Sequence, residues 1–187
     1  MKILRSNQYQ RANCNFHWIK KPILSGRYRQ WLQDEGSLTK RLRQRHDDFT
    51  VKPALVAYGK PFFDELTLLA IPMRNKVLVR EVFLMGGEQA LVFAHSVLPR
   101  SSMRGAWRGL RYLGNKPLGA KLFSAPQVQR MILSYKKLAP HHALYQQAIQ
   151  GFDEKPDYLW ARRSLFSLNC ANIMVTEVFL PRILLQS

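Results

Sequence analysis

The architecture follows from one segment, Val77-Leu78-Val79-Arg80-Glu81-Val82-Phe83-Leu84-Met85-Gly86-Gly87-Glu88, which precedes a second β-rich run from Gln89 to Leu98. Apolar residues dominate both runs, and Pro99 closes the second one. Two β-rich runs joined by a short glycine-containing turn predict an antiparallel hairpin. Because hairpins occur here without regular alternation of strands and helices, the sequence predicts an α+β fold, with helices packed on a single antiparallel β-sheet.

The rest of the chain completes a sheet of about six strands. Further strands are expected over residues 49–56, 128–132, 160–168 and 173–180, and the last two form a second hairpin across residues 169–172. Helices are expected over residues 27–32, 38–43, 101–113 and 140–149. Ser37 is the expected N-cap of the second helix. Residues 59–72 are interpreted as a long connection.

Two of the apolar strands carry charges at positions that should be buried. Period-two alternation places Arg80 on one face of its strand and Glu81 on the other, and it places Glu177 on a face with Ile173 and Val175. An ionised group that is buried without a partner is strongly destabilising. Either these charges pair with each other or reach solvent at a sheet edge, or they face a cavity that receives a small polar ligand.

Composition indicates one basic domain. A chain of 187 residues with 47% hydrophobic content suffices for one substantial core, so we expect a single domain over residues 1–187 with a poorly defined N-terminal extension at residues 1–26. Its 29 Lys and Arg residues against 12 Asp and Glu residues give a net charge of +17. The basic residues are dispersed and accompany no zinc-ligand spacing or RNA-recognition motif. We therefore expect no nucleic-acid partner, whereas a small anion stays open.

The low cysteine count and the absence of known sequence motifs argue against disulfide-rich, metal-binding, membrane-spanning and cofactor-dependent proteins. Cys14 and Cys170 are too few for a disulfide framework or a zinc site, and no apolar run reaches the ~18 residues of a membrane span, so a reducing, cytoplasmic location without a membrane span is expected. The chain has no phosphate-binding glycine loop, metal-spaced His pair or nucleophile elbow. We expect no cofactor and no metal.

Three groups of residues receive structural interpretations. His46 and His95 are single, and neither has an obvious carboxylate beside it in the sequence. Adjacent strand residues point to opposite faces, so one of Arg162 and Arg163 is expected to face outward, in a surface or salt-bridge role. The four Trp residues are expected to pack in the core or in surface-covering segments.

Five phrases stand out at characteristic separations: Trp31-Leu32-Gln33-Asp34-Glu35-Gly36-Ser37-Leu38-Thr39-Lys40-Arg41-Leu42, Val79-Arg80-Glu81-Val82-Phe83-Leu84, Leu113-Gly114-Asn115-Lys116-Pro117-Leu118-Gly119 with Leu122-Phe123, Trp160-Ala161-Arg162-Arg163-Ser164, and Thr176-Glu177-Val178-Phe179-Leu180-Pro181. In that order they resemble one known family, the chorismate lyases, which supply 4-hydroxybenzoate for ubiquinone synthesis. The resemblance covers roughly residues 30–182. It implies a single antiparallel sheet with helices and two helical flaps, here at about residues 37–45 and 98–118, that close over a buried site.

The resemblance also implies roles for four residues. Arg80 matches the family arginine that holds the ring carboxylate, and Glu177 matches the glutamate beside the ring hydroxyl. Leu38 and Leu118 match flap residues that bind substrate through their backbone amides, and the apolar side chain at position 38 differs from the Met of a well-known member. A guanidinium suits a carboxylate because its planar fork stays charged when desolvated. Glu177 either carries a proton or only positions the substrate.

The expected activity is that of a cofactor-free carbon–oxygen lyase, which acts as a monomer and converts chorismate to 4-hydroxybenzoate and pyruvate. The principal alternative is a non-catalytic sensor domain of the same fold that binds a small aromatic carboxylate, since effector domains of some transcription regulators resemble this fold. Such a module would normally bring a DNA-binding domain, and only some thirty residues precede the recognisable region, which favours the enzyme. A basic nucleic-acid-binding protein is the third possibility, and it predicts affinity that falls steeply with salt.

Overall fold

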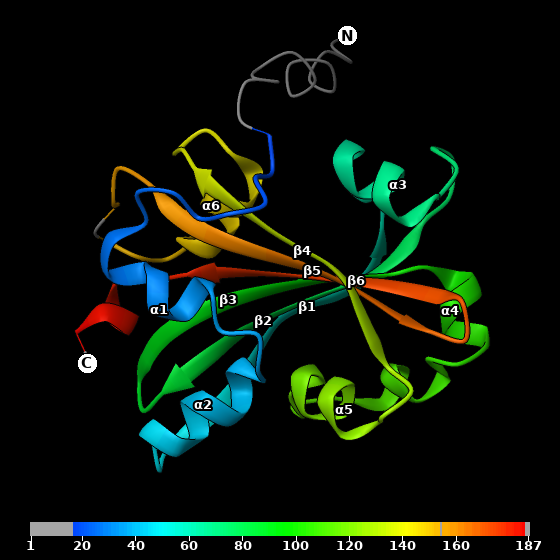
Figure 1. Cartoon of the computed structure of the whole chain (residues 1–187), viewed down its shortest axis with the longest axis horizontal. Coiled ribbons are helices and arrows are strands. Elements are labelled where there is room, and N and C mark those ends of the chain that lie inside the picture. Colours follow the sequence, from blue (N-terminus) through cyan, green and yellow to red (C-terminus); the bar gives the residue numbers. More distant parts are fainter. Residues whose placement is uncertain (1–16, 154, 186–187) are drawn as a thin grey trace, which may run out of the picture.

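The computed structural model describes residues 17–153 and 155–185, which leaves Cys14 and most of the expected N-terminal extension outside the described part. Within these ranges, six antiparallel strands form one sheet in the order β1-β2-β3-β6-β5-β4 (Figure 1). The α+β class is therefore confirmed. The strands are β1 (Phe49–Gly59), β2 (Val77–Gly86), β3 (Gln89–Leu98), β4 (Gln129–Leu138), β5 (Leu159–Leu168) and β6 (Ala171–Phe179).

Both predicted hairpins form, and their inner strands β3 and β6 pair with each other at the centre of the sheet. The second turn is shorter than expected, because β5 ends at Leu168 and β6 begins at Ala171. Asn169 and Cys170 have φ angles of 50° and 60°. Two consecutive positive φ values characterise the type I′ turn, whose twist matches that of the strands it joins.

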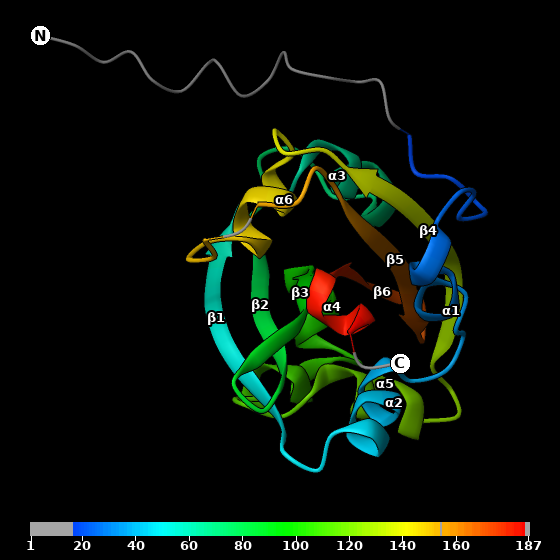
Figure 2. The same cartoon turned by 90° about the vertical axis from the view of Figure 1, so that its left-hand side faces the viewer.

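Helices cover both faces of the sheet (Figure 1). Helices α2 and α5 lie on one side of it, whereas α3 and α6 lie on the other, and the end-on view shows that the sheet is strongly curved (Figure 2). The helices are α1 (Arg29–Leu32), α2 (Leu38–Arg45), α3 (Phe63–Leu69), α4 (Arg100–Arg104), α5 (Leu118–Ser124) and α6 (Ala143–Ala148), with short 3-10 turns η1 (Gly26–Tyr28), η2 (Arg108–Tyr112) and η3 (Pro181–Leu184).

Each face has its own apolar core. On the face with α2 and α5, Trp31, Leu38 and Leu42 pack on Val82 and Leu84, and residues of α4, η2 and α5 pack on Val175 and its neighbours. On the opposite face, α6 packs around Phe93 and Val178, and Leu69 of α3 packs on strand residues that include Val97. Since both faces are covered, charged residues on either face become buried.

The structure corrects several predicted boundaries. Residues 59–72 are not a plain connection, because they contain α3, whose first turn is closed by Glu65 Oε2 accepting from the Phe62 N–H at 2.8 Å. The helix expected over residues 101–113 is divided into α4 and η2 by Gly105, whose φ and ψ of −106° and −125° are not helical. Strand β4 continues from Gln129 to Leu138, well past residue 132.

The structure corrects two interpretations of charged residues. His95 has carboxylates on both sides: its Nδ1 lies 2.9 Å from Glu81 Oε1, and its Nε2 lies 3.3 Å from Glu65 Oε1. Neither Arg162 nor Arg163 faces solvent, since their exposed fractions are 0% and 1%. The expected salt-bridge role is confirmed for both, since Arg162 Nε lies 2.7 Å from Glu177 Oε2 and Arg163 Nη1 lies 2.8 Å from Asp64 Oδ2. Sequence reasoning missed Asp64 and Glu65 as partners because α3, which supplies them, was not predicted, whereas Glu81 faces His95 across the predicted hairpin.

The N-terminal segment continues the sheet at its β4 edge. The backbone groups of Ile19 and Tyr135 exchange two hydrogen bonds of 2.8 and 2.9 Å. Among the described residues, no helix is long and apolar enough to cross a membrane.

Candidate active site

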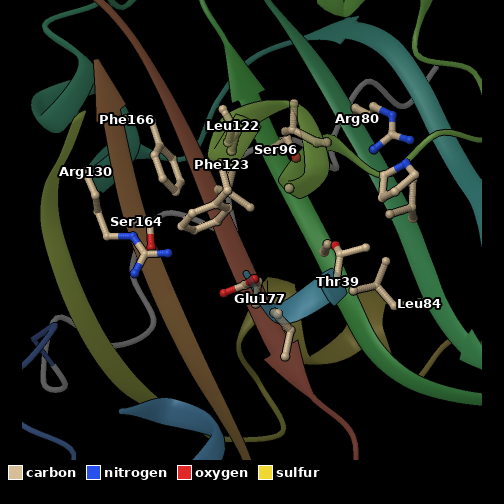
Figure 3. Close-up of a pocket in the computed structure, with 17 residues that line it drawn as sticks. Thr39, Arg80, Leu84, Ser96, Leu122, Phe123, Arg130, Ser164, Phe166 and Glu177 are labelled. Carbon is tan, nitrogen blue, oxygen red and sulfur yellow. The ribbon is translucent and has the colours of Figure 1, made fainter. Parts of the chain in front are cut away.

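A narrow cavity lies between the sheet and the N-terminal ends of α2 and α5, with about 40 Å³ open to water-sized molecules. All four residues that the sequence singled out, Arg80, Glu177, Leu38 and Leu118, line it. Figure 3 shows that Arg80 and Glu177 come from different strands and lie at different ends of the pocket. The two charges do not pair with each other, and so the interpretation that they neutralise each other is wrong.

Arg80 reaches the cavity from β2 and is only 4% exposed. Its Nη2 donates to the carbonyl oxygens of Gly114 and Lys116, at 3.0 Å each. These two carbonyls belong to the loop between η2 and α5, so one nitrogen of the guanidinium is used to fix that loop. Burial lowers the pKa of Arg80 below its usual value, yet an arginine side chain stays protonated in proteins. A permanent positive charge therefore lies at this end of the cavity.

Glu177 reaches the cavity from β6, and its carboxylate is held by a neighbouring strand. Arg162 Nε donates to Glu177 Oε2 at 2.7 Å. Nη1 of Arg162 donates to the carbonyl oxygens of Trp31 and Asp34. Burial lowers the pKa of Arg162, but the charges of Glu177 and Asp34 outweigh burial and raise it. Arg162 thus fixes Glu177 to the segment that links α1 to α2.

Leu38 and Leu118 are the first residues of α2 and α5, and both are buried. The first N–H groups of a helix have no intrahelical carbonyl partner, and the helix dipole favours negative charge there. The two helix starts touch, because a Cβ placed on Gly119 would lie 3.0 Å from Thr39 Oγ1. Two helix N-termini therefore meet above the sheet, at the cavity that Arg80 also lines.

Sequence reasoning missed Arg130 and Ser164 as cavity residues. Arg130 projects from β4, and its guanidinium carbon lies 5.0 Å and 5.2 Å from the ring centroids of Phe123 and Phe166. Its Nη1 donates to the Glu35 carbonyl at 2.8 Å. Figure 3 shows Arg130 beside Ser164, on the Glu177 side of the pocket. The sequence offers a signal for Ser164 alone: it stands two residues after Arg162 on β5, and the two side chains therefore lie on the same face of the strand.

The cavity suits a small aromatic or cyclic acid. It has a fixed cation and two helix starts at one part of its wall, a carboxylate at the other, and apolar walls that include Val82 and Leu122. No cluster of three or more His, Cys, Asp or Glu side chains that could hold a metal ion occurs within residues 17–153 and 155–185. The charged side chains that line the cavity are those of Arg80, Arg130 and Glu177.

Comparisons with known proteins identify relatives over nearly the whole chain. The family model described as chorismate lyase matches residues 15–187. A probable chorismate pyruvate-lyase from Nitrosospira multiformis is 48% identical over 169 residues, which cover 89% of this chain and 94% of the relative. The protein of the same name from Nitrosomonas eutropha is 44% identical over 174 residues, which cover 92% and 98%.

Solved structures with the same fold are much more distant in sequence. The effector domain of PhnF from Mycobacterium smegmatis has a TM-score of 0.53 at 14% identity, and the match covers 79% of this chain and 90% of that one. A GntR-family transcriptional regulator from Bacillus cereus has a TM-score of 0.53 at 11% identity, covering 72% and 93%. These likenesses show a shared fold alone.

Proposed function

The chain belongs to the chorismate lyase family, and we propose that it is a chorismate pyruvate-lyase, which converts chorismate to 4-hydroxybenzoate and pyruvate for ubiquinone biosynthesis. It is a cofactor-independent carbon–oxygen lyase. The observation that carries this proposal is the placement of Arg80 and Glu177 at two ends of one cavity beneath α2 and α5. That arrangement matches a ring that carries a carboxylate on one carbon and a hydroxyl on the opposite one.

In this proposal the ring carboxylate binds beside Arg80. The guanidinium offers a charge-assisted hydrogen bond, and the backbone N–H groups of Leu38 and Leu118 supply further donors. Because the anchoring carbonyls of Gly114 and Lys116 use Nη2 of Arg80, the guanidinium is already oriented before substrate binds. Pre-orientation of this kind lowers the ordering cost of binding.

Glu177 then accepts a hydrogen bond from the ring hydroxyl. Its Oε2 is engaged by Arg162, so the carboxylate acts as a fixed acceptor that sets the ring's position. The hydrogen on the hydroxyl-bearing ring carbon moves to the methylene carbon of the enolpyruvyl group while the ether bond to the ring breaks. The ring becomes aromatic, and the departing group leaves directly as pyruvate. Such a transfer needs correct geometry and exclusion of water rather than a separate base.

Access to the cavity requires movement of the segments that cover it. With about 40 Å³ open, the cavity as it stands cannot hold a six-membered ring with its substituents unless α2, α5 or lining side chains shift. Opening and closing of covering segments limits turnover in many enzymes. We also propose that release of 4-hydroxybenzoate is slow. The protein is further proposed to act in the cytoplasm as a monomer with a single domain.

Turnover of chorismate tests the proposal. Purified protein is mixed with chorismate, and 4-hydroxybenzoate and pyruvate are quantified by chromatography. We expect equimolar products from the wild type, a large loss of rate in Arg80→Ala and Glu177→Ala, and unchanged rates in Arg74→Met, which removes an exposed arginine that does not line the cavity. Folded wild-type protein that binds 4-hydroxybenzoate but forms no product would instead support the sensor alternative.

A further inference from the structure

Two buried polar atoms in the cavity wall lack partners. Arg130 Nε and Ser164 Oγ are inaccessible to solvent, and neither makes a hydrogen bond within the described residues. Both side chains line the cavity, and Figure 3 shows them next to each other on the side of the pocket away from Arg80. Native proteins pair the great majority of their buried polar atoms, so two unpaired donors at one place indicate a missing acceptor.

The charges around this place also call for an anion. Arg130 and Arg162 lie on neighbouring strands and on the same face of the sheet. Glu177 pairs directly with Arg162. Arg130 itself forms no ion pair with a carboxylate of the described residues, and its Nη1 donates to the backbone carbonyl of Glu35 instead. Burial and the positive charge of Arg162 lower the pKa of Arg130, and the charges of Glu177 and Glu35 offset this only in part. A bound carboxylate would relieve both penalties by pairing with the guanidinium.

The proposed substrate carries a second carboxylate, on its enolpyruvyl group. This group is attached to the ring carbon next to the hydroxyl-bearing carbon. Because Glu177 contacts the hydroxyl in the proposed function, the enolpyruvyl group must also lie near Glu177. We infer that Arg130, together with the Ser164 hydroxyl, binds the enolpyruvyl carboxylate of chorismate. This inference rests on the proposed function and deepens it, because it assigns the part of the cavity that receives the leaving group. The cavity then holds one arginine for each carboxylate of the dianion.

The assignment has a consequence for the reaction. Phe123 and Phe166 flank the Arg130 guanidinium and restrict its movement, so the carboxylate it binds has a defined direction. Holding that carboxylate orients the methylene carbon toward the ring hydrogen it receives. After the ether bond breaks, Arg130 contacts pyruvate, whereas 4-hydroxybenzoate contacts only Arg80, Glu177 and the helix starts. Arg130 is thus specific for substrate and for the leaving group.

The test compares two variants at this subsite with one at the other end of the cavity. Steady-state kinetics with chorismate and calorimetric binding of 4-hydroxybenzoate are measured for Arg130→Met, Ser164→Ala and Arg80→Met, with Arg74→Met as an exposed control. Arg130 also holds the Glu35 carbonyl, so its replacement can perturb folding. Ser164 Oγ makes no hydrogen bond in the described structure, and Ser164→Ala therefore tests the subsite without that complication.

We expect kcat/KM for chorismate to fall about 10- to 100-fold in Arg130→Met, the range for a lost charge-assisted hydrogen bond, and about 3- to 10-fold in Ser164→Ala. The dissociation constant of 4-hydroxybenzoate should change less than about threefold in both variants, while Arg80→Met weakens both ligands. Equal losses for chorismate and 4-hydroxybenzoate, or unchanged chorismate kinetics in both variants, would overturn the assignment while leaving the lyase activity established. A wild type without turnover would instead overturn the proposed function.

Discussion

Arg162 and Glu177 are direct cross-strand partners on β5 and β6, and Arg162 Nε donates to Glu177 Oε2 at 2.7 Å. The arginine is fully buried, whereas the Glu177 side chain retains 16% of its exposure, toward the cavity. The pair therefore joins a buried cation to a carboxylate that lines the cavity. Its energetics follow those of buried ion pairs, in which loss of one partner strands the other charge.

Replacing Arg162 by Met should be strongly destabilising. The variant leaves the Glu177 carboxylate without its cation and frees the carbonyls of Trp31 and Asp34, so we expect a loss of about 3–5 kcal/mol in the free energy of unfolding. Urea denaturation measures it. The double variant Arg162→Met, Glu177→Gln should recover part of this loss, because no charge is then stranded. A single-variant loss no larger than that of exposed Arg74→Met would contradict the description of the pair.

The stability of the protein should depend on pH through His95. Burial lowers the pKa of His95, but Glu65 and Glu81 outweigh burial and raise it to about 9. A group whose pKa is raised on folding stabilises the folded state. This contribution is complete at pH values below the group's pKa in the unfolded state, near 6.5, and is lost as the pH rises through its pKa in the folded state. We therefore expect unfolding free energy to fall on the order of 3 kcal/mol between pH 6.5 and 9.5.

Urea denaturation across this pH window, for the wild type and His95→Gln, checks the prediction. The neutral amide cannot titrate, so the variant should show a much flatter profile over the same window. Parallel profiles for the two proteins would mean that other groups cause the pH dependence and that His95 is not charged in the folded state.

The contact between the two helix starts should control product binding. A Cβ on Gly119 would lie 3.0 Å from Thr39 Oγ1, so Gly119→Ala should push α5 away from α2 and separate the amides of Leu38 and Leu118. We expect 4-hydroxybenzoate to bind about tenfold more weakly, the loss of about one hydrogen bond. Thr39→Ala removes the obstructing oxygen, so adding it to Gly119→Ala should restore affinity. Additive losses in calorimetric titrations would show that the two residues do not interact.

Label transfer distinguishes the two routes for the ring hydrogen. Chorismate with deuterium on the hydroxyl-bearing ring carbon should yield pyruvate with deuterium in its methyl group, because the proposed transfer is intramolecular. Rapid reduction of the pyruvate to lactate, followed by mass spectrometry, measures the label. Deuterium lost to water would mean that a group such as Glu177 carries the proton.

The sequence predicts the elements with strong periodicity. Alternation around Arg80 and the glycine turn after it correctly indicate a central hairpin, and Ser37 is correctly identified as a cap, since its Oγ accepts from the Lys40 N–H at 3.3 Å. The short helix α3 escaped detection because its seven residues lie between prolines and have no long amphipathic repeat. Without α3, Glu65 and Asp64 could not be anticipated as the partners of His95 and Arg163.

The sequence predicts only part of the candidate site. Arg80 and Glu177 are conspicuous because each interrupts an apolar strand. Arg130 is not, because it occurs beside Gln129 and Met131 in an edge strand with mixed character, where an arginine is expected to be solvated. Its role depends on sheet curvature and on the rings of Phe123 and Phe166, which only the tertiary structure brings together.

The most direct measurement is a crystal structure of the protein with 4-hydroxybenzoate. We predict that the ligand lies in the cavity under α2 and α5, with its carboxylate beside Arg80 and the N–H groups of Leu38 and Leu118, and its hydroxyl beside Glu177. The side of the pocket at Arg130 and Ser164 should stay free for the leaving group. A ligand bound elsewhere, or one in this cavity with its carboxylate turned away from Arg80, would contradict the account.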